Sequence, residues 1–127
     1  MQLDWQDARL TLLYVMSPSC TWCQKNAENI KTIYRARAND YRFVGLSVTT
    51  RGLDAYRRTS GIPFPICSDL RHASGKRLAL ARTPETLIIS PKGIVLHRWR
   101  GAYAGVIAQD IEETLGVRLP GLSESGT

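Results

Sequence analysis

Two cysteines separated by two residues lie where an apolar segment passes into a helical pattern. Residues 10–16 are almost wholly apolar, residues 17–19 interrupt them, and from Cys20 onward apolar side chains recur every three or four residues. Cys20 is therefore predicted at the N-terminus of a helix, where unpaired backbone N–H groups favour a thiolate. Cys23 falls one turn further along, within reach of Cys20 and more shielded. This order of strand, dithiol and helix predicts a redox site in which Cys20 attacks a disulfide and Cys23 resolves the mixed disulfide.

The segments around the cysteine pair predict a β-α-β unit. Residues 9–16 have the continuous apolar character of a strand buried on both faces, and residues 41–49 are rich in β-forming side chains. The helix between them is expected over residues 21–38, so that the two strands are parallel and the crossover is right-handed. Its inward face is expected to carry Cys23, Ala27, Ile30, Ile33, Tyr34 and Ala38, and its outward face Lys25, Glu28, Asn29, Thr32 and Arg35.

The second half of the chain predicts three further strands and two helices. The elements are, in order, a helix over 52–60, an edge strand over 63–67, a loop over 69–81, a strand over 83–90, a turn over 91–93, an antiparallel strand over 94–100 and a helix over 104–115. The inward side chains are expected to be Leu53, Ala55 and Tyr56 on the helix at 52–60, while Val95, His97 and Trp99 share one face of the strand at 94–100.

The length and composition are those of a single globular domain. The chain has 127 residues, of which 43% are hydrophobic. We expect a lead-in at residues 1–8, one folded domain at 9–116 and a C-terminal tail at 117–127, which is polar and frayed from residue 120 onward. No apolar run approaches the roughly 20 residues needed to cross a bilayer, and the first segment lacks the pattern of a secretion signal. Taken as written, the chain is expected in the cytoplasm.

The cysteine count and the charge narrow the function further. Three cysteines cannot all pair internally, and a C-x-x-C between a strand and a helix indicates redox catalysis rather than a disulfide scaffold. Cys67 is expected to be a small buried apolar residue, and the alternative is a regulatory thiol. The net charge is +6, but the arginines are scattered without a basic run, so no nucleic-acid partner is expected. Two interpretations of the charge stay open: a solvated basic surface, or steering of an acidic partner.

The order of the motifs resembles the thioredoxin fold. The C-x-x-C follows a first strand, Thr83-Pro84 opens a later strand, and residues 91–93 form a hairpin before the last helix. The inserted helix and strand at 52–67 are similar to those of TlpA and ResA, the redoxin-type thiol-disulfide oxidoreductases of bacterial envelopes. The resemblance covers residues 9–116 and implies an α/β fold with a central mixed β-sheet flanked by helices. It also implies an envelope location if a signal or anchor was trimmed, with membrane contact only through such an anchor.

The resemblance implies roles for the residues around the dithiol. Cys20 resembles the attacking cysteine and Cys23 the resolving one. The dipeptide Thr21-Trp22 between them would tune the reduction potential of the cysteine pair and contact the partner. Pro84 matches the cis-proline beside the dithiol, and Thr83 would offer backbone groups to an extended segment of the partner. The implied partners are a protein disulfide or dithiol and an upstream electron donor. We expect a monomer that acts as a reductase, with no cofactor and no metal.

Two features depart from the thioredoxin pattern. Thioredoxin has a buried acid six positions before its attacking cysteine, and here that position is Tyr14, so another group or water must accept the proton of the resolving thiol. Glu85, directly after the predicted cis-proline, is preferred over Glu28 as the candidate proton carrier, and the alternative for Glu85 is a solvated acid at the strand edge. The lead-in at 16–19 is similar to that of the thioredoxin-like maturation protein for methylamine dehydrogenase, which implies a dedicated partner.

Two other functions are considered. A peroxiredoxin-like thiol peroxidase normally shows Pro-x-x-x-Thr-x-x-Cys, and here Leu13 and Ser17 occupy the first two of those positions. A non-catalytic copper chaperone on the same fold spaces its cysteines by three residues and adds a histidine near the later strand, where this chain has Arg82-Thr83. Both patterns therefore fit less well than a thiol-disulfide oxidoreductase.

Overall fold

A five-stranded sheet with the strand order β3-β2-β1-β4-β5 forms the centre of the protein. The computed structural model describes residues 9–68 and 83–123, so the expected lead-in at 1–8 and loop at 69–81 lie outside the described residues. The elements are β1 (Leu10–Met16), α1 (Thr21–Lys25), α2 (Ala27–Arg37), β2 (Tyr41–Ser47), α3 (Leu53–Ser60), β3 (Ile66–Cys67), β4 (Glu85–Ile89), β5 (Val95–Arg100) and α5 (Gly105–Leu115). Among the described residues, no helix is long and apolar enough to cross a membrane.

The sheet is mixed, and β1 is its central strand. β1 pairs in parallel with β2 and antiparallel with β4, so that Tyr14 has Gly45 on one side and Thr86 on the other. The short strand β3 adds to the far edge of β2 in parallel. These pairings confirm the expected mixed sheet, the β-α-β unit and the inserted helix and strand.

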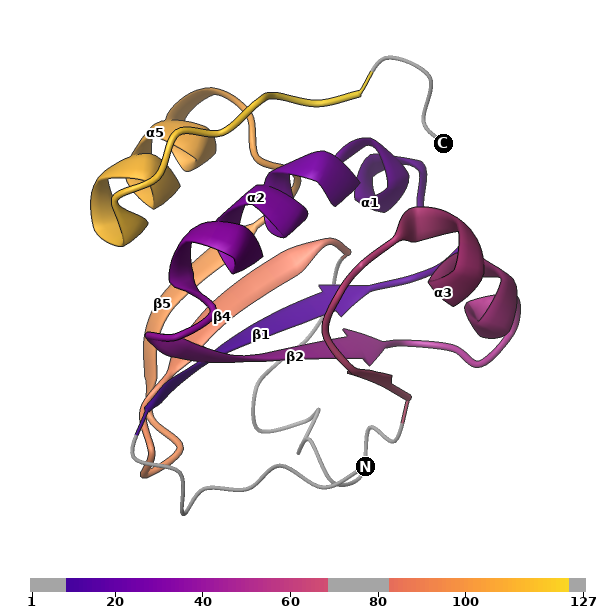
Figure 1. The fold of residues 1–127 in the computed structure, drawn as a ribbon, viewed down its shortest axis with the longest axis horizontal. Coiled ribbons are helices and arrows are strands. Elements are labelled where there is room, and N and C mark those ends of the chain that lie inside the picture. The colour runs from indigo at the N-terminus through magenta and orange to yellow at the C-terminus, as the bar shows by residue number, and fades with distance from the viewer. Residues whose placement is uncertain (1–8, 69–82, 124–127) are drawn as a thin grey trace.

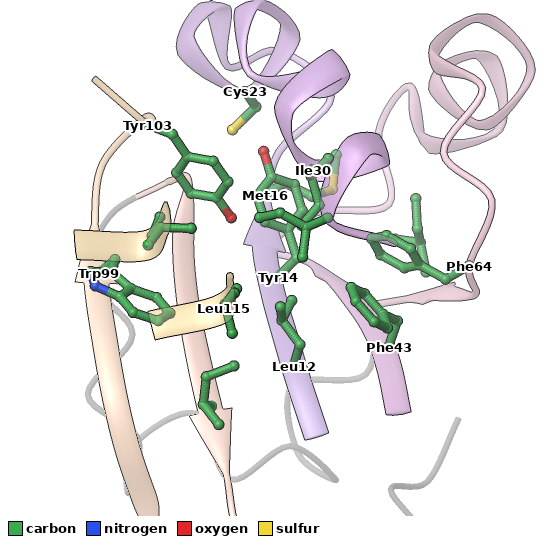
Figure 2. Close-up of a cluster of buried hydrophobic side chains, with 14 of the residues drawn as sticks. Leu12, Tyr14, Met16, Cys23, Ile30, Phe43, Phe64, Trp99, Tyr103 and Leu115 are labelled. Atoms are coloured by element: carbon green, nitrogen blue, oxygen red, sulfur yellow. The ribbon is translucent and has the colours of Figure 1, made fainter. Parts of the chain in front are cut away.

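Alternate residues of β1 supply two separate cores, because successive side chains of a strand point to opposite faces. Leu12, Tyr14 and Met16 belong to the larger cluster, whereas Leu13 and Val15 belong to the smaller one on the other face. The helices α1, α2 and α5 lie over the face of the larger cluster (Figure 1). Figure 2 shows how its side chains fill the space between β1 and these helices.

The helix expected over 21–38 is broken at Asn26, which separates α1 from α2. The Asn26 side chain is completely buried and holds three hydrogen bonds. Its Oδ1 accepts from the Tyr103 backbone N–H at 3.0 Å and from Asn29 Nδ2 at 3.1 Å, and its Nδ2 donates to the Tyr14 hydroxyl at 3.2 Å. The prediction that Asn29 faces outward is wrong, because this buried amide pair satisfies its polar atoms.

The C-terminal segment at 117–123 lies along the helices, so the expectation of a frayed tail is wrong for residues 120–123. Val117 and Leu119 pack against the larger cluster. The backbone N–H of Gly121 donates to Asn29 Oδ1 at 2.9 Å, and that of Ser123 donates to the Lys25 carbonyl at 2.9 Å. Figure 1 shows this segment returning from α5 across α2 toward α1.

Two expectations about side-chain direction are also corrected. The pairing of β4 with β5 has a β-bulge at Ile88 and Ile89, which shifts the register. Val95 therefore faces the smaller cluster, while His97 and Trp99 lie on the opposite face. The rings of His97 and Trp99 stack 5.5 Å apart. On α3, Leu53 and Tyr56 are buried as expected, but Ala55 is exposed, because it lies on the solvent side of this two-turn helix.

Glycine is required at position 45 of β2 for close packing of the edge strand. A Cβ atom at this position would lie 2.8 Å from Ile66 Cγ1. The Gly45 backbone N–H also donates to the Pro65 carbonyl at 2.7 Å. The inserted strand therefore approaches the sheet as closely as its backbone allows.

Replacing Asn26 by alanine is predicted to destabilise the protein by about 2–4 kcal/mol, because the Tyr14 hydroxyl, the Tyr103 N–H and the Asn29 amide would all lose a buried partner. The free energy of unfolding, measured by urea titration, tests this. Asn39→Ala is the matched control, since Asn39 is exposed, and should change stability by less than about 0.5 kcal/mol. Equal effects of the two substitutions would contradict a structural role for the Asn26 amide.

Candidate active site

Cys20 lies just beyond the carboxyl end of the central strand, at the start of α1. It is the N-cap residue of that helix, and its sulfur accepts the backbone N–H of Cys23 at 3.0 Å. Its own N–H donates to the Ser17 carbonyl at 3.1 Å, which fixes the turn between β1 and α1. The side chain is half-buried, so a sulfur atom of a partner can reach it. A thiolate here would receive a charge-assisted hydrogen bond from the helix backbone.

The segment before β4 meets the dithiol, as the sequence predicts. The Thr83-Pro84 peptide bond is cis. The Cys20 thiol donates to the Thr83 carbonyl at an Sγ–O distance of 3.6 Å. β4 is antiparallel to β1, so the start of β4 lies beside the end of β1, and this pairing brings together residues 63 positions apart.

Cys23 differs from Cys20 in being completely buried within the larger cluster. Burial raises the pKa of the Cys23 thiol well above its usual range, and a hydrogen bond with Cys20 raises it further. The structure shows both cysteines as free thiols. The pair is therefore asymmetric, with one accessible sulfur and one sulfur that is held as a neutral thiol.

Three buried phenols surround the Cys23 thiol: Tyr14, Tyr56 and Tyr103. Burial is the main cause that raises the pKa of each, and the Cys23 thiol raises all three further. Tyr14 occupies the position of the acid in thioredoxin, and its ring meets that of Tyr103 edge-on at 6.5 Å. Figure 2 shows Cys23 beside these two rings.

Of these three tyrosines, the sequence indicates only Tyr14 as a neighbour of the dithiol. Tyr56 and Tyr103 were missed, since nothing in a local pattern indicates that they converge on one thiol. The Tyr103 hydroxyl is joined to Thr86 Oγ1 at 2.5 Å, which ties the loop before α5 to β4. The Cys23 thiol therefore interacts electrostatically with three buried phenols and with the Cys20 thiol.

The dipeptide between the cysteines is at the surface. Thr21 is exposed, and 54% of the Trp22 surface is accessible, unusually high for so large an apolar side chain. The Lys25 ammonium lies 4.9 Å from the centre of the Trp22 ring. Trp22 is thus positioned where a partner can touch it.

The structure does not bring Glu85 together with the resolving sulfur. Glu85 lies opposite Val15 on β1, on the face of the smaller cluster, whereas Cys23 lies on the other face. Its carboxylate is fully buried and lies 3.4 Å from Arg98 Nε and 3.8 Å from Arg100 Nε. The alternative of a solvated acid is therefore wrong.

The other candidate proton carrier, Glu28, lies away from the dithiol. Glu28 is exposed on α2 and pairs with Lys31 at 2.6 Å. Across residues 9–68 and 83–123, no three side chains of histidine, cysteine, aspartate or glutamate gather in a group that could hold a metal ion.

Known structures with the same fold include several redox proteins. StoA from Bacillus subtilis superposes with a TM-score of 0.67 at 18% identity, covering 84% of this chain and 83% of that one. A secreted Mycobacterium tuberculosis disulfide oxidoreductase homologous to Escherichia coli DsbE gives 0.67 at 14% identity, covering 86% and 81%. A putative thioredoxin from Neisseria meningitidis gives 0.68 at 18% identity, covering 88% and 77%. At these identities the likeness establishes the thioredoxin-like fold.

The sequence itself matches one family model. No curated protein sequence matches the chain. The model of the AhpC/TSA family matches residues 2–98, well over half of the chain, and this span includes both cysteines and the cis-proline. The protein therefore belongs to the AhpC/TSA family and has the thioredoxin-like fold of redoxin-type oxidoreductases.

Proposed function

We propose that this protein is a thiol-disulfide oxidoreductase that exchanges disulfides with a protein partner through Cys20 and Cys23, in the reducing direction. The observation that carries the proposal is the asymmetry of the two sulfurs. Cys20 is accessible at a helix N-terminus beside the Thr83 carbonyl, and Cys23 is completely buried one turn away. This arrangement separates the group that meets the partner from the group that completes the exchange.

The exchange proceeds in two displacements. The Cys20 thiolate attacks one sulfur of the partner disulfide, forming a mixed disulfide and releasing the other partner sulfur as a thiolate. Cys23 then loses its proton and attacks the Cys20 sulfur, which closes the Cys20–Cys23 disulfide and releases the second partner thiolate. The partner gains two electrons, and an upstream dithiol donor must return two electrons to the protein.

The surroundings of Cys20 support the reducing direction. Strong oxidants of this kind owe their potential to a stabilised reduced form. Within the described residues, the hydrogen-bond partners of the Cys20 sulfur are the Cys23 N–H, the Thr83 carbonyl and the neutral Cys23 thiol, and none of them carries a full charge. The site thus lacks, in the part of the chain that the structure describes, a charged partner that would stabilise the dithiol form strongly.

The reduction potential of the cysteine pair is predicted to lie below roughly −230 mV, in the range of reducing members of the fold. Equilibration against a dithiol buffer with alkylation readout measures it. A value near about −120 mV would instead indicate an oxidant and would overturn the proposed direction. Failure to form the disulfide at any potential would overturn the redox proposal as a whole.

Substitution of each cysteine is predicted to give a different result. Cys20→Ser should abolish reduction of a protein disulfide, and Cys23→Ser should accumulate mixed disulfides, visible as higher-mass bands on a non-reducing gel. Cys67→Ala is the control, because Cys67 lies in the smaller cluster away from the dithiol, and it should retain activity. Full activity of Cys20→Ser would rule out the mechanism.

The second displacement is predicted to accelerate with rising pH. The pKa of Cys23 is raised by burial, so the thiol is almost wholly protonated near neutral pH and its thiolate fraction rises about tenfold per pH unit. The lifetime of a mixed disulfide on Cys20, followed by quenched flow and mass spectrometry, should therefore shorten from pH 6 to pH 9. A lifetime independent of pH would contradict proton loss from Cys23 as the limiting event.

A thiol peroxidase is the second candidate. The AhpC/TSA family, whose model matches this chain, supports considering it. Ser17 stands at the position of the peroxidase threonine, is buried, and contacts Ser19 with an Oγ–Oγ distance of 3.2 Å. An assay with hydrogen peroxide and reduced protein distinguishes the two functions. Turnover of peroxide that depends on Cys20 and exceeds disulfide exchange would favour the peroxidase.

A further inference from the structure

A pocket of about 750 Å³ lies next to the dithiol, between the active-site turn and α3. Pro18, Ser19 and Gln24 line it on the side of the active site, and Arg51, Ala55 and Tyr56 line it on the side of α3. Pro18 and Ser19 directly precede Cys20, so the pocket lies beside the turn that carries the attacking sulfur. Thr83, whose carbonyl contacts Cys20, is not among the residues that line the pocket.

The wall formed by Tyr56 connects the pocket to the dithiol. Tyr56 is 6% exposed, and its buried hydroxyl makes no hydrogen bond with any described residue. The Ser60 hydroxyl is near enough to lower the pKa of Tyr56, but the two groups do not meet in hydrogen-bond geometry. Burial raises the pKa of Tyr56, and the thiols of Cys23 and Cys20 raise it further, so the phenol lies in electrostatic range of both sulfurs. A buried polar group without a partner is unfavourable and indicates that a ligand can supply one.

The charge at the pocket is positive. Arg51 is the charged residue among those that line it, its side chain is exposed, and it makes no ion pair with a described residue. The neighbouring acids are neutralised, since Asp54 pairs with Arg57 at 3.1 Å and Glu28 pairs with Lys31 at 2.6 Å. The rest of the lining is mostly small residues, and Ser19, Thr59 and Ser60 among them offer hydroxyl groups, which suits the backbone and short side chains of a peptide.

We propose that this pocket binds an acidic segment of the partner protein that flanks the partner's reactive disulfide. The partner's cysteine would be held at Cys20 while a carboxylate one to three residues away meets Arg51. The charge of the whole chain, +6, favours the approach of such a partner. This inference rests on the proposed disulfide exchange and specifies its substrate class.

The test compares three peptides that contain the same intramolecular disulfide and differ only in the flanking residues, which are acidic, neutral or basic. The reduced protein is the reagent, and kcat/KM for peptide reduction is the readout, with a chemical dithiol to regenerate the protein. The wild-type protein is expected to prefer the acidic peptide to the basic one by about twofold to fivefold, the scale of an exposed ion pair. The preference should fall at about 1 M salt, because the Debye length is then only roughly 3 Å.

Two substitutions in the pocket and one control outside it test whether the preference for the acidic peptide arises at the pocket. Arg51→Glu is expected to abolish or reverse the ratio of kcat/KM between the acidic and basic peptides. Arg58→Glu is the matched control, because Arg58 is an exposed arginine of α3 that does not line the pocket and the substitution changes the net charge equally. Ala55→Phe, which fills the pocket from an exposed position, should raise KM for the acidic peptide.

The outcomes separate this inference from the proposed function. Equal kcat/KM for the three peptides, or an equal effect of Arg58→Glu and Arg51→Glu, would overturn the pocket assignment, the latter by showing steering by overall charge. A small neutral disulfide, hydroxyethyl disulfide, reports the exchange reaction alone. If the wild-type protein reduces neither this compound nor any peptide, the proposed function fails; if it reduces all of them without preference, only the pocket assignment fails.

Discussion

The buried side-chain amide of Asn26 determines where the dithiol lies relative to the sheet. It separates the short helix α1 from α2 and joins that break to Tyr14 of the central strand and to the backbone of Tyr103 in the loop before α5. Three parts of the chain that are distant in sequence thus meet at one polar group inside an apolar core. Because a buried amide must be satisfied, this contact specifies a single arrangement of helix, strand and loop.

The different surroundings of the two sulfurs follow from that arrangement. The cap position leaves Cys20 at the surface, whereas one helical turn carries Cys23 beneath it into the cluster with Tyr14 and Tyr103. The cluster around Cys23 offers phenols and amides, which donate hydrogen bonds but accept protons poorly. Burial raises the pKa of the Cys23 thiol, so loss of its proton is the demanding step of the exchange that we propose.

The sequence predicted the strands and the pairing of the central ones, but it did not predict the break at Asn26 or the direction of individual side chains that distant partners hold. The central strand and the C-x-x-C at the start of a helix follow from apolar runs and motifs that a short window contains, whereas the cis-proline was expected from the resemblance to the thioredoxin fold. The burial of Asn29 was missed, because its partners Asn26 and Gly121 can be recognised only in three dimensions. The direction of Val95 was wrong because a β-bulge is a feature of two strands together and has no signature in one of them.

The course of residues 117–123 has a practical meaning for any fusion or immobilised form of the protein. The backbone of Ser123 is hydrogen-bonded to the last residue of the helix that carries the dithiol, and Figure 1 shows the segment ending near α1. A tag, linker or surface attached after this segment would start beside the surface where Trp22 is exposed and would compete with a partner for space. Attachment through an exposed position on the hairpin at 91–94, such as Lys92, keeps the dithiol free, because that turn lies at the opposite end of β4.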